Sequence, residues 1–212
     1  MIRTLIFLIG GFAMAAETST IKLDAKANFK LKNVAAEAVT YKGRKALKVI
    51  EANGPGEAMV VLPADFHNGV IEADIAGSVG AGAPEGSRGF VGIAFRVSPD
   101  TTKFECFYLR PTNGRAEEQE RRNHSVQYVS APEYPWQRLR KEEPEKYESY
   151  VDLIADAWTK VKIVVEGSQA KLYVHGNEQP SLIVRDLKKG DTRGALAFGL
   201  AAAQWRISQI SG

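Results

Sequence analysis

Two acidic residues on one predicted strand are the first candidates for chemistry. The segment GVIEADI (69–75) alternates apolar and acidic residues, so Glu72 and Asp74 point to the same side of an extended strand. A retaining glycosidase needs two carboxyl groups about 5–5.5 Å apart, one as nucleophile and one as acid/base. Residues two positions apart on a strand are separated by roughly 6.6 Å. Glu72 and Asp74 are therefore our candidate catalytic residues.

A polar and aromatic excursion interrupts the chain between residues 107 and 150. Planar amide and guanidinium groups hydrogen-bond sugar hydroxyls, and aromatic rings stack on sugar rings. We predict that this excursion and the two strands before it bind a saccharide through Arg96, Tyr108, Arg110, Asn123, His124, Gln127, Tyr134 and Trp136. The alternatives are a structural loop whose aromatic residues fill a gap, and a disordered segment.

The charges of the excursion balance. Residues 110–148 contain eight basic and eight acidic side chains, and the whole chain has 28 Lys and Arg against 25 Asp and Glu. Nucleic acids and heparin-like polyanions require a clear excess of positive charge. We therefore expect a neutral or mildly anionic saccharide, and no nucleic acid, as the partner.

The elements that must position these residues are strands. Short alternating or β-branched segments bounded by turn residues recur along the chain, among them GVIEADI, GFVGIAFRV (89–97), KFECFYLR (103–110) and WTKVKIVVEG (158–167). Many short strands at this spacing predict an all-β fold, an antiparallel two-sheet jelly-roll sandwich with a long mid-chain loop excursion.

Alternation also assigns faces to the strands. Val91, Ile93, Phe95 and Val97 form an apolar row that we expect in the core. If the strands are neighbours in one sheet, a single outer face carries Glu72, Asp74, Arg96, Tyr108 and Arg110. The alternative is that these acids and arginines pair with each other across the strands and hold no ligand.

The order of these segments, with the words GIAFR, FYLRP and WTKVKI, resembles the concanavalin A-like lectin/glucanase superfamily. Within it, the chain is most similar to bacterial exported domains of the 3-keto-disaccharide hydrolase type. The resemblance covers residues 25 to 211. It implies a jelly roll that holds saccharides on its concave face, with long insertions between strands as a wall. Members include hydrolases, non-catalytic sugar-binding modules and partner-binding domains, so the fold leaves the function open.

The family 16 glycoside hydrolases of this superfamily carry acid, x, acid, x, x, acid on one strand. Here EADIAG supplies Glu72 and Asp74, but Gly77 occupies the third acidic position. The acid/base that the resemblance would imply is thus missing, and we do not expect family 16-type catalysis. Another hydrolase or lyase activity at Glu72 and Asp74 stays open.

The N-terminal residues have the pattern of an export signal. Arg3 gives a positive start, residues 5–12 are apolar, and Ala13-Met14-Ala15 is a typical cleavage site. The apolar run is shorter than the roughly 20 residues that span a bilayer, so we expect no transmembrane segment. We expect residues 1–15 to be a signal peptide and residues 16–212 to form a single β-sandwich domain that is periplasmic or secreted.

The sequence predicts no metal and no cofactor. His67, His124 and His175 lack the spacing of metal ligands. Ca²⁺ occurs in several proteins of the superfamily that the chain resembles, but no run of carboxylates here forms a calcium cage. The single cysteine, Cys106, cannot form an internal disulfide and is most simply a buried apolar residue.

These observations lead to one expectation and one alternative. We expect an exported domain that binds or processes a carbohydrate on the concave face under the excursion. The alternative is a non-catalytic β-sandwich that binds a protein partner in the cell envelope.

Overall fold

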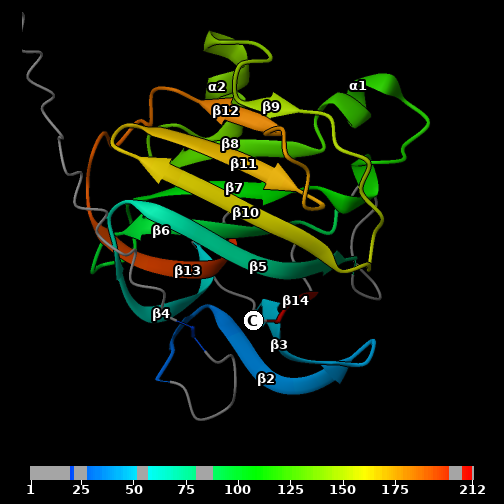
Figure 1. Ribbon diagram of the computed structural model, residues 1–212, viewed down its shortest axis with the longest axis vertical. Coiled ribbons are helices and arrows are strands. Elements are labelled where there is room, and N and C mark those ends of the chain that lie inside the picture. The colour runs from blue at the N-terminus through cyan, green and yellow to red at the C-terminus, as the bar shows by residue number, and fades with distance from the viewer. Residues whose placement is uncertain (1–19, 22–27, 52–56, 80–87, 201–206, 212) are drawn as a thin grey trace, which may run out of the picture.

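The computed structural model describes residues 20–21, 28–51, 57–79, 88–200 and 207–211. Two antiparallel seven-stranded sheets pack face to face, which confirms the predicted all-β sandwich. Figure 1 looks through both layers, with β5, β10 and β11 in front of β6, β7 and β8. The expected signal peptide lies outside the described residues, so its removal stays a prediction.

The first sheet, called the β7 sheet below, has the strand order β1-β4-β13-β6-β7-β8-β9. Its strands are β1 (Lys30–Lys32), β4 (Ala58–Phe66), β13 (Gly194–Leu200), β6 (Val91–Val97), β7 (Phe104–Leu109), β8 (Val126–Ala131) and β9 (Glu148–Ser149).

The second sheet, called the β5 sheet, has the order β12-β11-β10-β5-β14-β3-β2. Its strands are β12 (Leu182–Val184), β11 (Gln169–Val174), β10 (Thr159–Glu166), β5 (Gly69–Ser78), β14 (Ile207–Ser211), β3 (Arg44–Glu51) and β2 (Val34–Tyr41).

The core lies between the two sheets. The register places Ile93 opposite Phe107 and Phe107 opposite Tyr128, so these large side chains share the inner face of the β7 sheet. All three are fully buried, as are Val91 and Phe95 in the row that the sequence assigned to the core. Burying each such side chain contributes about 1.5–3 kcal/mol, which makes this row a main source of the sandwich's stability.

The expectation of one shared outer face is wrong. Glu72 and Asp74 lie on β5, whereas Tyr108 lies on β7 in the other sheet. The two acids do point outward, since Ile71, Ala73 and Ile75 are buried on the opposite side of β5. They therefore face away from the sandwich on the side opposite to the outer face of the β7 sheet.

Arg96 also departs from the predicted alternation. The register between β13 and β6 shifts near Arg96, so that Phe95 and Arg96 together oppose a single residue of β13, and Arg96 has a φ of 55°. Such a β-bulge bends the strand and re-aims a side chain. The alternation that placed Arg96 on an outer face consequently fails at this residue.

The bulge directs the Arg96 side chain toward a group of hydrogen-bond acceptors that surround it. Its side chain is 0% exposed. It donates hydrogen bonds to the carbonyl oxygens of His67 (3.1 Å), Gly167 (2.7 Å) and Gly190, and to Asn68 Oδ1 (2.9 Å). These acceptors belong to three different turns. Arg96 thus ties one end of the sandwich together, and its position does not support the predicted role as a ligand anchor.

The excursion is more ordered than the loop that we expected. It contains a 3-10 helix η1 (Pro111–Asn113), α1 (Gln119–Asn123), strand β8, α2 (Trp136–Glu142) and strand β9. All six residues of β8 are buried even though Gln127 and Ser130 are polar. Figure 1 shows α1 and α2 together at the edge of the molecule where β8 and β9 lie.

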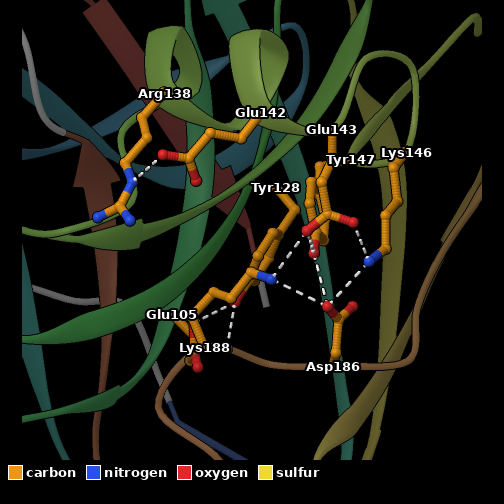
Figure 2. Close-up of polar contacts among 9 residues, drawn as sticks. All are labelled: Glu105, Tyr128, Arg138, Glu142, Glu143, Lys146, Tyr147, Asp186 and Lys188. Atoms are coloured by element: carbon orange, nitrogen blue, oxygen red, sulfur yellow. Dashed lines mark hydrogen bonds and ion pairs between the residues drawn. The ribbon is translucent and has the colours of Figure 1, made fainter.

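The end of the excursion is fastened to the loop that follows β12 (Figure 2). Tyr147 donates a hydrogen bond to Asp186 (2.7 Å), and Lys188 and Lys146 bind the same carboxylate oxygen at 2.9 and 3.0 Å. Burial would raise the pKa of Asp186, but these three hydrogen bonds outweigh it and hold the pKa at about 2. The cluster fixes the position of the polypeptide that leads into β9.

A second contact holds the same loop from inside the core. Tyr128 donates to the Glu105 carboxylate (2.6 Å), and its hydroxyl accepts the backbone N–H of Lys188 (2.8 Å). The other Glu105 oxygen accepts the backbone N–H of Lys189 (2.6 Å). Burial raises the pKa of Glu105, while the hydrogen bonds from Tyr128 and Lys189 oppose that rise.

Candidate functional site

A groove of about 630 Å³ opens where the excursion folds over the edge of the β7 sheet. One wall is the end of α1, and the other is β9 with the residue after it. The groove lining includes Glu120, Asn123, His124, Arg140, Glu148 and Tyr150. Asn123 and His124 are thus two predicted ligand-binding residues that the structure brings together in one hollow.

Glu148 is the most deeply buried charged group of this groove. Its side chain is only 4% exposed, and it accepts two hydrogen bonds from the Arg140 guanidinium, at 3.0 and 2.7 Å. His124 Nδ1 lies 2.9 Å from the same carboxylate, although without the alignment of a hydrogen bond. Arg140 and Glu148 therefore form one ion pair in the wall of the groove, with the His124 ring beside the carboxylate.

The pKa of His124 is lowered from its ordinary value. Burial is the main cause, and the neighbouring Arg140 and Arg110 add to it, while Glu148 acts in the opposite direction. The imidazole is consequently neutral at pH 7. A neutral imidazole in a groove can both donate and accept hydrogen bonds.

Arg110 lies beneath the groove and supports it. Its guanidinium donates to the Tyr108 hydroxyl (2.8 Å), the His124 carbonyl oxygen (2.9 Å) and Gln127 Oε1 (3.3 Å). Arg110, Tyr108 and Gln127 are all buried. The structure therefore brings these three predicted ligand-binding residues together, but as a hydrogen-bonded layer under the groove lining.

The two aromatic residues that we predicted to bind the ligand, Trp136 and Tyr134, lie in different surroundings. Trp136 opens α2 and is partly buried, with the guanidinium of Arg110 5.8 Å and that of Arg140 4.7 Å from its ring. It separates two like charges and packs on the core. Tyr134 lies against Arg138 (4.3 Å) and Lys188 (5.5 Å), beside the Asp186 cluster. Neither ring is part of the groove lining.

The predicted catalytic pair lies away from the groove. Asp74 forms an ion pair with Arg44 of β3 (2.8 Å), and Glu72 lies opposite Lys162 of β10. Asp74 thus pairs across strands, but with Arg44 and not with Arg96 or Arg110, the arginines named in the alternative to a ligand site.

Gly77 has a packing reason to be a glycine. A Cβ at this position would collide with the Gly89 carbonyl oxygen and approach Val91 Cγ1 to 2.9 Å. The third acid of the family 16 pattern therefore has no room at this point of the fold.

Sequence reasoning did not single out Arg140, Glu148 and Tyr150 as binding residues. Arg140 and Glu148 entered only a count of charges, because nothing in the run QRLRKEEPEKYESYVDL distinguishes the buried acid from its exposed neighbours. The one available signal is the alternation around β9, where Glu148 and Tyr150 flank Ser149.

Among the described residues, no group of three or more His, Cys, Asp or Glu side chains is arranged to hold a metal ion. Cys106 is buried, and its thiol pKa is raised by that burial. Within the part of the chain that the structure covers, no helix has the length and apolar character to cross a bilayer.

No family model and no curated protein matches this chain. A carbohydrate-binding module from Bacillus subtilis has the same fold with a TM-score of 0.60, at 11% identity over 91% of this chain and 97% of its own. For a proposed glycosyl hydrolase from Parabacteroides distasonis the TM-score is 0.55, at 9% identity over 91% of this chain and 95% of that protein. A Bacillus subtilis protein with a galectin-like fold has a TM-score of 0.50, at 13% identity over 87% of this chain and 89% of that protein.

At these identities the likeness establishes the fold alone. These neighbours share the two-sheet jelly-roll sandwich fold of this chain, and the resemblance to the concanavalin A-like superfamily stays a prediction. The finer resemblance to the 3-keto-disaccharide hydrolase type is not confirmed by these neighbours.

Proposed function

We propose that this chain is an exported carbohydrate-binding domain that holds a saccharide in the groove between α1 and β9. The observation that carries the proposal is the groove itself, whose walls combine a neutral imidazole, an amide, an Arg–Glu pair and an exposed tyrosine. The carbohydrate-binding module among the fold neighbours supports it. Export, and the finer relation to domains of the 3-keto-disaccharide hydrolase type, are parts of the same proposal.

The chemistry of the groove suits sugar hydroxyls. Each hydroxyl donates one hydrogen bond and accepts others, so a site that binds several of them needs donors and acceptors side by side. Arg140 and Glu148 supply such a pair, and Asn123 supplies both functions in one amide. The buried Arg110 layer holds the His124 backbone in place before a ligand arrives, which lowers the entropy cost of binding.

Carbohydrate processing is a second candidate, and the contact between His124 and Glu148 favours it. A general base must be unprotonated at the working pH, and burial keeps the His124 pKa low enough for that. Glu148 lies 2.9 Å from His124 Nδ1, where it can stabilise a protonated ring. In this version His124, in place of Glu72 and Asp74, exchanges a proton with the sugar.

A glycan array with turnover assays on its hits tests both versions. We expect residues 16–212 to bind neutral glycans, Asn123→Ala to lose that binding while folded, and Asp74→Asn on the far sheet to keep it. Product formation that disappears in His124→Gln would establish processing. Failure of the folded wild type to bind any glycan would contradict the proposal, and recovery of one specific envelope protein would then support the protein-partner alternative.

A further inference from the structure

Tyr150 borders two hollows. It lines the groove described above, and it also lines a second hollow of about 320 Å³ together with Arg115, Glu117, Arg122 and Asp152. Its side chain is 48% exposed, which is unusual for a large aromatic residue in a structure whose other tyrosines on the same edge are buried or half-buried. The exposed ring thus lies at the boundary between the two hollows.

The same two segments form the walls of both hollows. Arg122 faces the second hollow, while the next residues, Asn123 and His124, face the first. On the opposite wall, directly after β9, burial alternates as it does on a strand, with Tyr150 and Asp152 exposed and Val151 buried. Outward residues with this alternation follow each other at about 6.6 Å. The hollows are therefore consecutive parts of one cleft.

The wall of the second hollow is fixed mainly by its backbone. Arg115 adds a two-point fork to Asp152, at 2.7 and 2.9 Å, but both side chains are more than half exposed and such pairs contribute little. The Asp152 carbonyl oxygen also contacts His175 Nε2 at 2.8 Å. Gly114 packs so closely on the backbone of Leu153 that a Cβ would collide with it. These contacts hold the wall in place without a ligand, as a preorganised binding surface requires.

The charges along the cleft select against anionic ligands. Its lining contains three arginines and five carboxylates, and His124 is neutral at pH 7. A net negative lining repels sulfated or uronic acid polymers. An elongated neutral ligand with apolar C–H faces and many hydroxyls matches both the charge and the exposed ring.

We propose that the two hollows are successive subsites for one neutral oligosaccharide, and that Tyr150 is the aromatic residue against which the sugar at their junction stacks. This inference rests on the proposed function and adds a ligand class to it, a chain of sugar units rather than a single sugar. It also assigns a binding role to Tyr150, Arg122 and Glu117.

Calorimetric titration with ladders of gluco-, xylo-, galacto- and fructo-oligosaccharides of increasing length tests the inference. The affinity of the wild type should rise by about tenfold or more from the monosaccharide to the longer members of one ladder. Glu117→Ala and Arg122→Ala, in the second hollow, should remove this gain with length. Asn123→Ala, in the first hollow, should weaken binding of every member.

Tyr150→Ala should also remove the gain with length, while Tyr150→Phe should keep it because the ring remains. Equal affinity of the wild type for short and long members of the bound ladder would overturn the inference and leave the proposed function standing. Binding of no ladder at all would overturn both. Tighter binding of oligogalacturonate than of the galacto-oligosaccharide of equal length would refute the assignment to neutral ligands.

Discussion

The Arg140 guanidinium and the Glu148 carboxylate face each other as a two-point fork, with Nε 3.0 Å from Oε1 and Nη2 2.7 Å from Oε2. Arg140 comes from α2 and Glu148 from β9, so the pair joins the two sides of the excursion. Charge-assisted pairs of this geometry are among the stronger hydrogen bonds in proteins. The groove therefore depends on this pair for its shape as well as for its charge.

Replacing Glu148 with Gln should weaken both the fold and the groove. The change removes the counter-charge of the Arg140 guanidinium at a position that is itself buried. We expect this to cost about 2–3 kcal/mol of unfolding free energy. Urea denaturation measures this loss, and titration with a bound glycan should show reduced affinity.

Glu142→Gln is the matched control for that variant. Glu142 also pairs with an arginine, Arg138 (2.9 Å), but both side chains are about half exposed, and Figure 2 shows them on α2 apart from the Asp186 cluster. Exposed pairs contribute little to stability. Equal losses in Glu148→Gln and Glu142→Gln would contradict the importance given to the Glu148 fork.

Arg96→Ala should destabilise the protein without changing how it binds glycans. The substitution leaves three partly buried carbonyl oxygens without their donor, so we expect a loss of about 2–3 kcal/mol. The denaturation midpoint measures the loss, and titration of the folded fraction measures binding. Loss of affinity in a folded Arg96 variant would instead restore its predicted role as a ligand anchor.

Glu72→Gln and Asp74→Asn should leave glycan binding and any turnover unchanged. Both acids lie on the outer face of the β5 sheet, and Asp74 is already paired with Arg44. The two single variants and the double variant, assayed beside wild type, check this. Abolished turnover with an unchanged melting temperature would place the active site on the β5 sheet. It would contradict the groove as the site of turnover.

Acid should loosen the attachment of the excursion through Asp186. Its pKa is about 2 in the folded protein, below the ordinary value of 3.8, so the unfolded state binds more protons between these values. The stabilisation is present above pH 4 and is lost as the pH falls from about 4 to about 2. Because the side chain is partly exposed, we expect about 1 kcal/mol after allowance for solvent screening.

Urea denaturation midpoints between pH 5 and pH 2 check this, with Asp186→Asn as the comparison. The variant should be less stable than wild type at pH 5, and the difference should shrink toward pH 2 because Asn does not titrate. A difference that stays constant over this range would show that Asp186 does not contribute through its charge.

The sequence determined that the chain is a two-sheet β-sandwich. The alternation of apolar residues in GVIEADI and GFVGIAFRV marks strands with one buried face, and the structure places Ile71, Ile93 and Phe95 in the core. It also located the excursion as the place where polar residues gather. Asn123 and His124 line the groove there, and Tyr108, Arg110 and Gln127 lie directly beneath it.

Only the tertiary structure decided which of these residues share a surface. Alternation is a property of one strand, whereas membership of a sheet depends on pairing between distant segments, which placed Glu72 and Tyr108 in different sheets. The bulge at Arg96 follows from the register with β13, about 100 residues later in the chain. Packing of α2, β9 and α1 likewise decides the fork between Arg140 and Glu148 and the exposure of Tyr150. The sequence does not contain this information, because a glutamate that becomes buried and one that stays exposed are the same residue type.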